Sequence, residues 1–298
     1  MDKKLTVKES FSDLIEECLS ENDNTYFIGF DVQRHGIKPS QHEDHIINMP
    51  ICEETIMGVA VGLSRCGCMV FVDLMLEAFV YRTFDVFFNQ ISLSEISPFN
   101  NSYAPIIVRM HSGTSDGAGI QHGSNPLSIL IRIPNILISI PLTSSDLDWV
   151  YKYSCINKIL FVLLYDFSNI ESLVSRMFFL NGKYYQLGEG RRICIFSVPN
   201  NLSLISRYLN KPITTLRIIV PIFFNKKFLL EIFEDNYDVE EFFVIDYDNI
   251  LFTLINEYFQ KEGFMKKLNF INIFSNGSSK VIQEEQLIVM LNSILKYE

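Results

Sequence analysis

A glutamate placed where a helix begins is the first residue whose setting could do chemistry. Glu53 follows the segment Pro50-Ile-Cys52 and opens a helical pattern that carries Gly58 and Gly62 four positions apart. Glycines at that spacing let another backbone pack closely on one helix face. The helix dipole favours a carboxylate at a helix N-terminus, so a structural charge explains Glu53 as readily as a functional one. The spacing alone leaves both interpretations open.

A glycine-rich loop with a histidine near each end is the second such segment. It runs from Arg109 to His122, includes His111 and begins at the end of a predicted strand, 106–110. In open α/β sheets, ligands bind at the carboxyl ends of the strands. Glycines also let a backbone approach a ligand closely. A flexible surface turn is the competing interpretation of this loop.

Other short motifs give weaker signals. The sequence has no phosphate loop of the G-x-x-x-x-G-K-[ST] type and no G-x-S-x-G nucleophile elbow. His42-Glu-Asp-His45 has no evident further ligand set, so we expect a solvated loop there and no metal site. Cys66-Gly-Cys68 lies where a predicted helix ends at a glycine, and we expect two packed thiols. The six cysteines form no paired C-x-x-C clusters, which indicates reduced thiols.

The elements that would position these residues alternate between strand and helix. The first series of apolar strands is expected at 26–30, 70–74, 106–110, 136–140 and 159–164. Helices are expected after the capping boxes that begin at Thr6 and Thr143, and at 53–66 and 79–96. Apolar strands that alternate with helices indicate a parallel sheet covered on both faces.

The regularity lapses between about 167 and 190 and then resumes. The second series of strands is expected at 193–198, 215–220, 242–246 and 270–274, with a final helix from about Val281. The sequence therefore predicts an α/β protein of two parallel-sheet domains. We place them at 1–167 and 190–298, joined by a linker at 168–189.

Composition excludes several classes of protein. The chain has 298 residues, is 48% hydrophobic and carries a net charge of −10. That charge argues against a nucleic-acid partner, which requires a basic surface. No apolar run reaches the ~20 residues of a membrane span, and the N-terminus lacks the apolar stretch of a signal peptide, so we expect a cytoplasmic protein. Twenty-five phenylalanines indicate a large apolar core or a contact surface for a partner.

Four segments in this order resemble the β subunit of the thiamine-diphosphate-dependent 2-oxoacid dehydrogenases of the pyruvate, branched-chain and acetoin types. They are Phe27-Ile-Gly-Phe-Asp-Val32, Pro50-Ile-Cys-Glu53, Glu77-Ala-Phe-Val-Tyr-Arg-Thr-Phe-Asp85 and Val108-Arg-Met…Gln-His122. That family is related more distantly to the C-terminal half of transketolase. The resemblance is strong over about 5–165 and weak beyond it. It implies a transketolase-like pyrimidine-binding domain followed by a transketolase C-terminal-like domain.

The resemblance implies roles for single residues. Glu53 matches the glutamate that hydrogen-bonds a ring nitrogen of the cofactor's aminopyrimidine and promotes its imino tautomer. That role needs a carboxyl group held dry, and we expect Pro50-Ile-Cys52 to supply an apolar setting. Phe79 matches the aromatic residue that stacks on the aminopyrimidine, with Met75 one helical turn before it in the same pocket wall. His122 matches an active-site histidine, which can move protons near neutral pH.

The resemblance also implies a partner. In this family a Gly-Asp-Gly…Asn segment binds the diphosphate of the cofactor and its magnesium ion, and this chain has no Gly-Asp-Gly. We therefore expect a separate α subunit to bind the diphosphate and the magnesium, in an α2β2 assembly. A lipoyl-bearing acyltransferase would be a further partner if the chemistry is that of a dehydrogenase. We predict no metal ligands in this chain and no membrane partner.

The main hypothesis is a β-type subunit of a heteromeric thiamine-diphosphate enzyme, active only with its partner. Such an enzyme cleaves a 2-oxoacid or a ketose and transfers the acyl-anion equivalent. A transketolase-type or acyloin-type subunit in specialised sugar or secondary metabolism is the alternative. A non-catalytic scaffold is a further alternative, favoured by Phe30, which stands where the family usually has an acidic residue, and by the divergent C-terminal part. Glu53, Phe79 and His122 argue against it.

Overall fold

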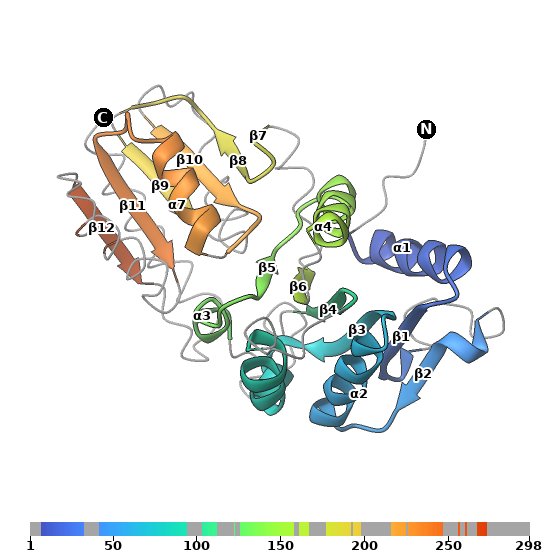
Figure 1. Cartoon of the computed structure of the whole chain (residues 1–298). Coiled ribbons are helices and arrows are strands. Elements are labelled where there is room, and N and C mark those ends of the chain that lie inside the picture. The colour runs from blue at the N-terminus through green and yellow to red at the C-terminus, as the bar shows by residue number, and fades with distance from the viewer. Residues whose placement is uncertain are drawn as a thin grey trace. The chain divides into compact units, whose positions relative to one another are not determined.

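A six-stranded sheet organises the first half of the chain (Figure 1). The computed structural model describes residues 7–32, 42–93, 103–111, 122, 126–157, 161–166, 177–191, 193–197, 216–224, 226–246, 256, 260 and 267–272. The strands of this first sheet are β1 (Thr25–Phe30), β2 (Ile46–Met49), β3 (Met69–Leu76), β4 (Ile106–His111), β5 (Leu137–Ser139) and β6 (Phe161–Asp166). They lie in the order β2-β1-β3-β4-β6-β5, and every neighbouring pair is parallel. The predicted α/β class and first parallel sheet are therefore confirmed.

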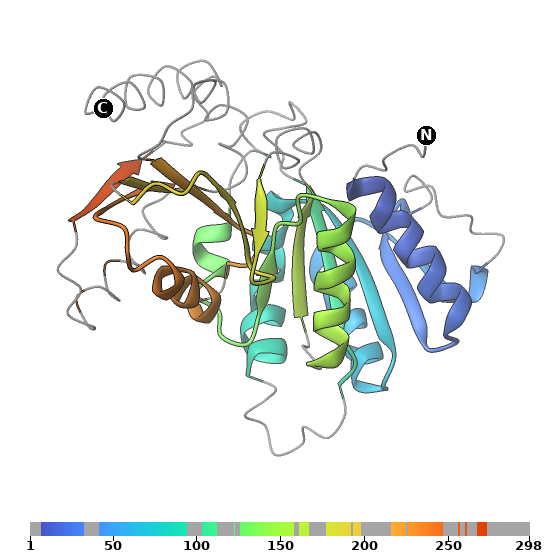
Figure 2. The same ribbon diagram turned by 90° about the horizontal axis from the view of Figure 1, so that it is seen from above.

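Helices cover both faces of the first sheet. Its helical elements are α1 (Val7–Glu21), η3 (Glu43–His45), α2 (Glu53–Arg65), η4 (Glu77–Thr83), η5 (Val86–Ser92), α3 (Leu127–Leu130) and α4 (Ser144–Ile156). Helices α1 and α4 lie on one face, and α2 and η5 lie on the other (Figures 1 and 2). Phe11 of α1 packs edge-on against Phe71 of β3, and Tyr151 of α4 stacks on the same ring. The core of this unit thus lies between central strand β3 and the helices.

Local sequence signals explain where two of these helices begin and end. At the start of α4, Thr143 and Asp146 form the expected capping box, in which each side chain accepts a hydrogen bond from the other's backbone N–H. At the end of α2, Gly67 takes a left-handed φ of 87°, which stops the helix where the sequence predicted. The expected capping residue Thr6, the glycines of the loop at 112–121 and the final helix from Val281 lie outside the described residues.

One predicted helix has a different form. One helix was expected at 79–96, and its described part, which ends at residue 93, contains the 3₁₀ helix η4 followed by the π-helix η5. Apolar periodicity indicates a helical turn but does not distinguish α, 3₁₀ and π geometry over seven residues. Single-turn π segments are frequent at functional sites, and this one directly follows the segment that carries Phe79.

The second compact unit comprises Asn169–Glu298, after a first unit of Met1–Ser168. Its sheet contains β7 (Phe178–Leu180), β8 (Tyr184–Leu187), β9 (Ile193–Ser197), β10 (Leu216–Pro221), β11 (Glu241–Asp246) and β12 (Lys267–Asn272), in the order β12-β11-β9-β10-β8-β7. Helix α7 (Lys226–Asp235) precedes β11, and its apolar side chains, including Phe228 and Ile232, are buried. Strands β9 to β12 pair in parallel, as expected.

The second sheet differs from the parallel sheet that the sequence predicted. The second sheet is mixed, because β8 pairs antiparallel with both β10 and β7. The segment 168–189, expected to be a linker, contains these two strands. They are joined by a tight turn in which Asn181 and Gly182 have φ values of 53° and 68° and the Lys183 N–H donates to the Leu180 carbonyl. Asn-Gly is the pair preferred where both central residues of a hairpin turn have positive φ, so the signal was present in the sequence.

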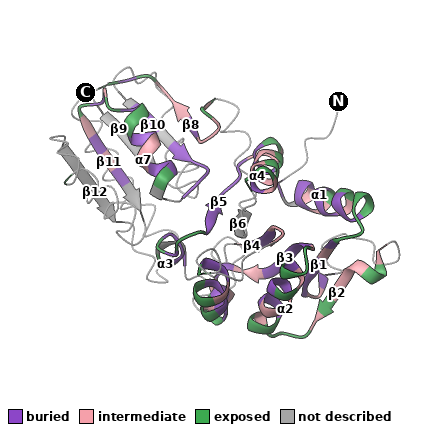
Figure 3. Ribbon diagram, in the orientation of Figure 1, coloured by how far each residue is buried: buried purple, intermediate pink, exposed green. Residues whose placement is uncertain are grey.

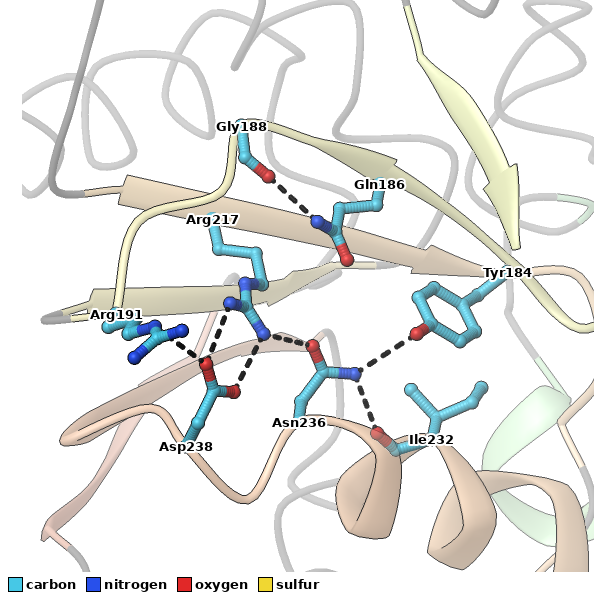
Figure 4. Close-up of polar contacts among 8 residues, drawn as sticks. All are labelled: Tyr184, Gln186, Gly188, Arg191, Arg217, Ile232, Asn236 and Asp238. Carbon is cyan, nitrogen blue, oxygen red and sulfur yellow. Dashed lines mark hydrogen bonds and ion pairs between the residues drawn. The ribbon is translucent and has the colours of Figure 1, made fainter. Parts of the chain in front are cut away.

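A polar network connects several elements of the second unit (Figure 4). Arg217 of β10 donates to both carboxylate oxygens of Asp238, at 3.0 and 3.1 Å, and to the amide oxygen of Asn236 at 2.7 Å. The Asn236 amide donates to the Ile232 carbonyl and to the Tyr184 hydroxyl. The network therefore ties the turn after α7 to strands β8 and β10.

Candidate active site

The candidate site residues implied by the family resemblance lie along the carboxyl edge of the first sheet. The register aligns Phe30 with Met49, Gly29 with Asp73 and Leu76 with His111. Because all six strands are parallel, their carboxyl ends meet at one edge, where open α/β sheets bind ligands. Glu53 follows β2 at this edge, Met75 and Phe79 lie at and after the end of β3, and His122 follows β4.

Glu53 is the first residue of α2 and is half-buried. The described residues do not form the dry, apolar setting expected from the three preceding residues, because Pro50, Ile51 and Cys52 are exposed, Ile51 to 70%. Cys52 instead makes a contact of 2.9 Å between its Sγ and the Thr55 hydroxyl. Ile51 therefore leaves an apolar side chain in water beside the candidate catalytic carboxyl.

The face of α2 that carries the two glycines is also open. A Cβ atom at Gly58 or at Gly62 would meet no atom of the described chain within 4 Å. The close backbone packing expected from their spacing is therefore not made by the described residues of this chain. The same helix contacts η4 and β3 on its other side, which links Glu53 to the elements that carry Phe79 and Met75.

Met75 was expected one helical turn before Phe79, but it lies near the end of strand β3 and has an unusual backbone. Its φ is 62°, in the left-handed region, and for a residue other than glycine that conformation costs roughly 1–2 kcal/mol. The Met75 N–H donates a hydrogen bond of 2.7 Å to Oδ1 of Asp73. Three steps along β3, from Asp73 to Leu76, match only two along β4, from Arg109 to His111. This one-residue β-bulge changes the direction of the chain where β3 reaches the candidate site. Met75 lies within the bulge and is half-buried.

A buried ion pair lies directly beneath the bulge. Nη2 of Arg109 lies 2.8 Å from Oδ2 of Asp73, and their side chains are 1% and 0% exposed. Strand β3 is buried up to its last two residues (Figure 3). The Arg109 guanidinium also lies over the ring of Phe11, 5.5 Å from its centroid. Gly29 leaves room for this arrangement, since a Cβ there would lie 2.8 Å from the Asp73 carbonyl oxygen.

Phe79 and His122 meet at this edge. Their rings lie 5.3 Å apart between centroids, at an interplanar angle of 81°, and both side chains are half-buried. Phe79 lies on η4, which is anchored by buried Val80 and Thr83. The structure therefore brings together two predicted site residues that are 43 positions apart in the sequence.

Sequence reasoning missed Asp73 and Gly29. Asp73 was hidden in an expected apolar strand, and Arg109 was noted only as the start of a loop. A single acid and a single base in two neighbouring buried strands are a usable signal, because buried charges are nearly always paired.

The remaining motifs contact their immediate surroundings. Nδ1 of His45 lies 3.0 Å from the Thr25 carbonyl oxygen, and its ring packs on Tyr26. Cys66 is exposed and Cys68 is half-buried, and both are free thiols. Among the described residues, no three or more His, Cys, Asp or Glu side chains are grouped so that they could hold a metal ion. No helix within the described ranges is long and apolar enough to cross a membrane.

These features define an α/β protein with a candidate ligand site at the carboxyl edge of a parallel sheet. Residues 3–165 match the family model "Transketolase, pyrimidine binding domain". This match covers more than half of the chain, and the chain belongs to that family.

Curated relatives are similar at low identity. The chain is 22% identical over 158 residues to the pyruvate dehydrogenase E1 component subunit beta-2, mitochondrial, of Oryza sativa, covering 50% of this chain and 42% of that protein. It is 23% identical over 163 residues to the acetoin:2,6-dichlorophenolindophenol oxidoreductase subunit beta of Cupriavidus necator, covering 49% and 48%. The chain thus spans about half the length of these relatives. It matches 74% of the pyruvate dehydrogenase E1 component subunit beta of Rickettsia bellii, at 23% identity.

Two solved structures share the fold. One is described as a split gene transketolase, inactive beta4 tetramer, with a TM-score of 0.72 and 15% identity over 99% of both chains. The other is the transketolase of Campylobacter jejuni, with a TM-score of 0.70 and 13% identity over 98% of this chain and 47% of that one.

Proposed function

We propose that this protein is the β-type subunit of a heteromeric thiamine-diphosphate enzyme that cleaves a 2-oxoacid and passes on the acyl-anion equivalent. The observation that carries the proposal is the carboxyl edge of the first sheet. There, Phe79 and His122 are in ring contact, Met75 lies near the end of the strand that precedes Phe79, and Glu53 opens α2, which contacts η4. The family match over 3–165 and the β-subunit relatives support it.

The residues present suit an aminopyrimidine ring. Such a ring needs an aromatic or apolar wall and a carboxyl group for its ring nitrogen, and Met75, Phe79 and Glu53 offer these groups. In this proposal Phe79 and Met75 form the wall, and Glu53 holds a proton at its carboxyl oxygen. His122 moves protons at the reacting carbon, as histidine can near neutral pH. Thiamine diphosphate, when bound, supplies the carbon nucleophile that attacks the substrate carbonyl.

The proposal includes a partner. Exposed Ile51 and the open Gly58–Gly62 face lie on the helix that Glu53 begins. A second chain that covers this surface would exclude water from the Glu53 carboxyl, which is only half-buried among the described residues. We propose that the partner is an α subunit that binds the diphosphate and magnesium, in an α2β2 assembly. We also propose that the second unit is a transketolase C-terminal-like domain.

A transketolase-type reaction is the second candidate. It is favoured by the fold match to the split gene transketolase, which extends over 99% of both chains and so includes the second unit. The substrates separate the two reactions, because a dehydrogenase-type enzyme consumes a 2-oxoacid and a transketolase-type enzyme needs a ketose donor and an aldose acceptor. The assembled complex should therefore be assayed with a 2-oxoacid and, separately, with a ketose donor and an aldose acceptor.

The test uses the complex of this chain with an α-type chain that carries the Gly-Asp-Gly…Asn segment. Turnover is followed as 2-oxoacid-dependent reduction of dichlorophenolindophenol, or as ketol transfer between sugar phosphates. Glu53→Gln is expected to lower turnover by about 10²–10⁴-fold. Glu54→Gln is the matched control, because Glu54 is the next residue of the same helix turn and is exposed. It should keep wild-type turnover.

Two outcomes would contradict the proposal. Unchanged cofactor-dependent turnover in Glu53→Gln would remove the catalytic role of Glu53 and favour a scaffold subunit. Robust thiamine-diphosphate activity from this chain by itself would show that no α subunit is needed.

A further inference from the structure

The backbone of Met75 has to be held in place by its surroundings. A left-handed conformation in a residue with a long side chain persists only where neighbouring contacts enforce it. Met75 has this conformation inside a β-bulge, and its N–H donates to Oδ1 of Asp73. The bulge lies immediately before η4, which carries Phe79. Any contact that holds the Asp73 side chain in place therefore also holds the direction in which the chain leaves β3 and enters η4.

Arg109 fixes Asp73. Both side chains are almost completely buried, and the contact of 2.8 Å joins the Asp73 oxygen that does not face Met75. The two residues are also aligned as register partners on β3 and β4. The Asp73 carboxylate thus contacts the Arg109 guanidinium through one oxygen and accepts the Met75 N–H through the other. A pair that only supported the sheet would not need to contact the bulge.

We propose that the Asp73–Arg109 pair is a positioning device for the candidate site, in which Arg109 holds Asp73 and Asp73 holds Met75 left-handed against the aminopyrimidine. The inference rests on the proposed function for the identity of the ligand. Neither residue touches the ligand in this scheme, and both act through Met75 and the turn that follows it. Gly29 belongs to the same device, because only a glycine leaves space beside the Asp73 carbonyl.

The main test replaces the pair by apolar residues of similar volume, Asp73→Leu with Arg109→Met. This double variant removes the acceptor for the Met75 N–H without leaving one buried charge behind. Val150→Ala is the matched control, since it opens a cavity at a buried position of α4. It lowers stability without touching the bulge. Arg109→Lys keeps the positive charge and is expected to retain most of the wild-type behaviour.

Two readouts are needed. The first is hydrogen exchange of the peptide that contains the Met75 amide, measured on the full chain and compared at matched global stability. Exchange should be at least tenfold faster in the double variant and unchanged in Val150→Ala. The second is calorimetric titration of the heteromeric complex with thiamine diphosphate and Mg²⁺. The Kd should rise at least tenfold in the double variant, whereas the Kd for inorganic diphosphate with Mg²⁺ should not change.

The outcomes separate this inference from the proposed function. Wild-type exchange at Met75 in the double variant overturns the positioning role. So does faster exchange with an unchanged Kd for thiamine diphosphate. A wild-type complex that fails to bind thiamine diphosphate overturns the proposed function itself, and with it the ligand part of the inference. If that double variant does not fold, Asp73→Ala with Arg109→Leu replaces it, because this pair of substitutions also removes the acceptor and both charges, with the same two readouts and the same directions expected.

Discussion

The Asp73–Arg109 ion pair of the first unit joins two neighbouring strands, whereas the Arg217–Asp238 pair of the second unit joins a strand to the turn after a helix. Asp73 and Arg109 are both almost completely buried, and Asp73 also accepts the N–H of a strained residue. Asp238 is 29% exposed, and its partner Arg217 is shared with a neutral amide, Asn236. The first pair is thus placed to hold backbone geometry at a candidate site, and the second to fasten a turn to a sheet.

The two ion pairs also differ in their access to water. The network of the second unit extends to exposed Arg191, whose Nε lies 3.2 Å from Asp238, so part of it is in contact with water. Water and neutral hydrogen bonds can replace a lost contact there. The first pair has no such access to solvent, so losing one partner leaves the other charge buried. Burial therefore sets how much stability is lost when one partner of such a pair is removed. The groups that the carboxylate contacts set the structural role of the pair.

Breaking the first pair should have the largest effect. Arg109→Met leaves the Asp73 carboxylate buried without its guanidinium, and we expect a loss of about 3–5 kcal/mol in the free energy of unfolding of the first unit. Trp149 is the only tryptophan of the chain and lies on α4, so its fluorescence in urea reports this unit. Adding Asp73→Leu should recover most of the loss. A loss below about 1 kcal/mol in the single variant would show that the pair is not needed.

Removing the neutral member of the second network should cost less. Asn236 is buried, accepts from Arg217 and donates to the Ile232 carbonyl. Asn236→Ala should lower the stability of the second unit by about 1–3 kcal/mol, measured by hydrogen exchange of β10 and β11 in urea. Asn157→Ala is the matched control, because its amide makes the same contact with a carbonyl four residues back but is exposed. Asn157 caps α4 of the first unit, so the cost of its substitution is measured by Trp149 fluorescence in urea. If both substitutions cost the same, burial does not set the strength of this network.

Local signals in the sequence predicted much of the first unit. The start of α4 at Thr143 and the end of α2 at Gly67 depend on residues within one helical turn, so they can be read without knowing the fold. The apolar strands and their alternation with helices similarly predicted the parallel sheet. The Asn181-Gly182 turn was equally local, and it was missed only because the surrounding segment was interpreted as a linker.

The site was only partly predictable. Met75 and Phe79 came from the family resemblance, whereas His122 was already indicated by the glycine-rich loop. Their neighbourhood depends on how β3 and β4 pair. The contact between Asp73 and Arg109 requires the register of two strands, and the bulge that follows requires that register to shift by one residue. Neither is encoded in a local pattern. The apolar setting expected for Glu53 was inferred from residue type alone, which does not reveal that Ile51 is 70% exposed.

The smallest expected effect is a pH dependence confined to the second unit. Burial raises the pKa of the Asp238 carboxyl, but hydrogen bonds from Arg217 and the charges of Arg217 and Arg191 outweigh it and lower the pKa below its ordinary value. The stability contributed by this carboxylate is therefore fully present above the ordinary aspartate pKa of about 3.9 and is lost as the pH falls through the lower folded-state value.

The wild-type second unit should accordingly lose stability more steeply than Asp238→Asn as the pH falls from about 5 to 3. The measurement is the urea midpoint of β10 and β11 by hydrogen exchange, at several pH values for both proteins. The difference should be small, because Asp238 is partly exposed and solvent screens its charge. Parallel curves would mean that Asn236 and packing hold Arg217 without help from the carboxylate. The charge in the second network would then be dispensable, which is the opposite of what we expect for Asp73.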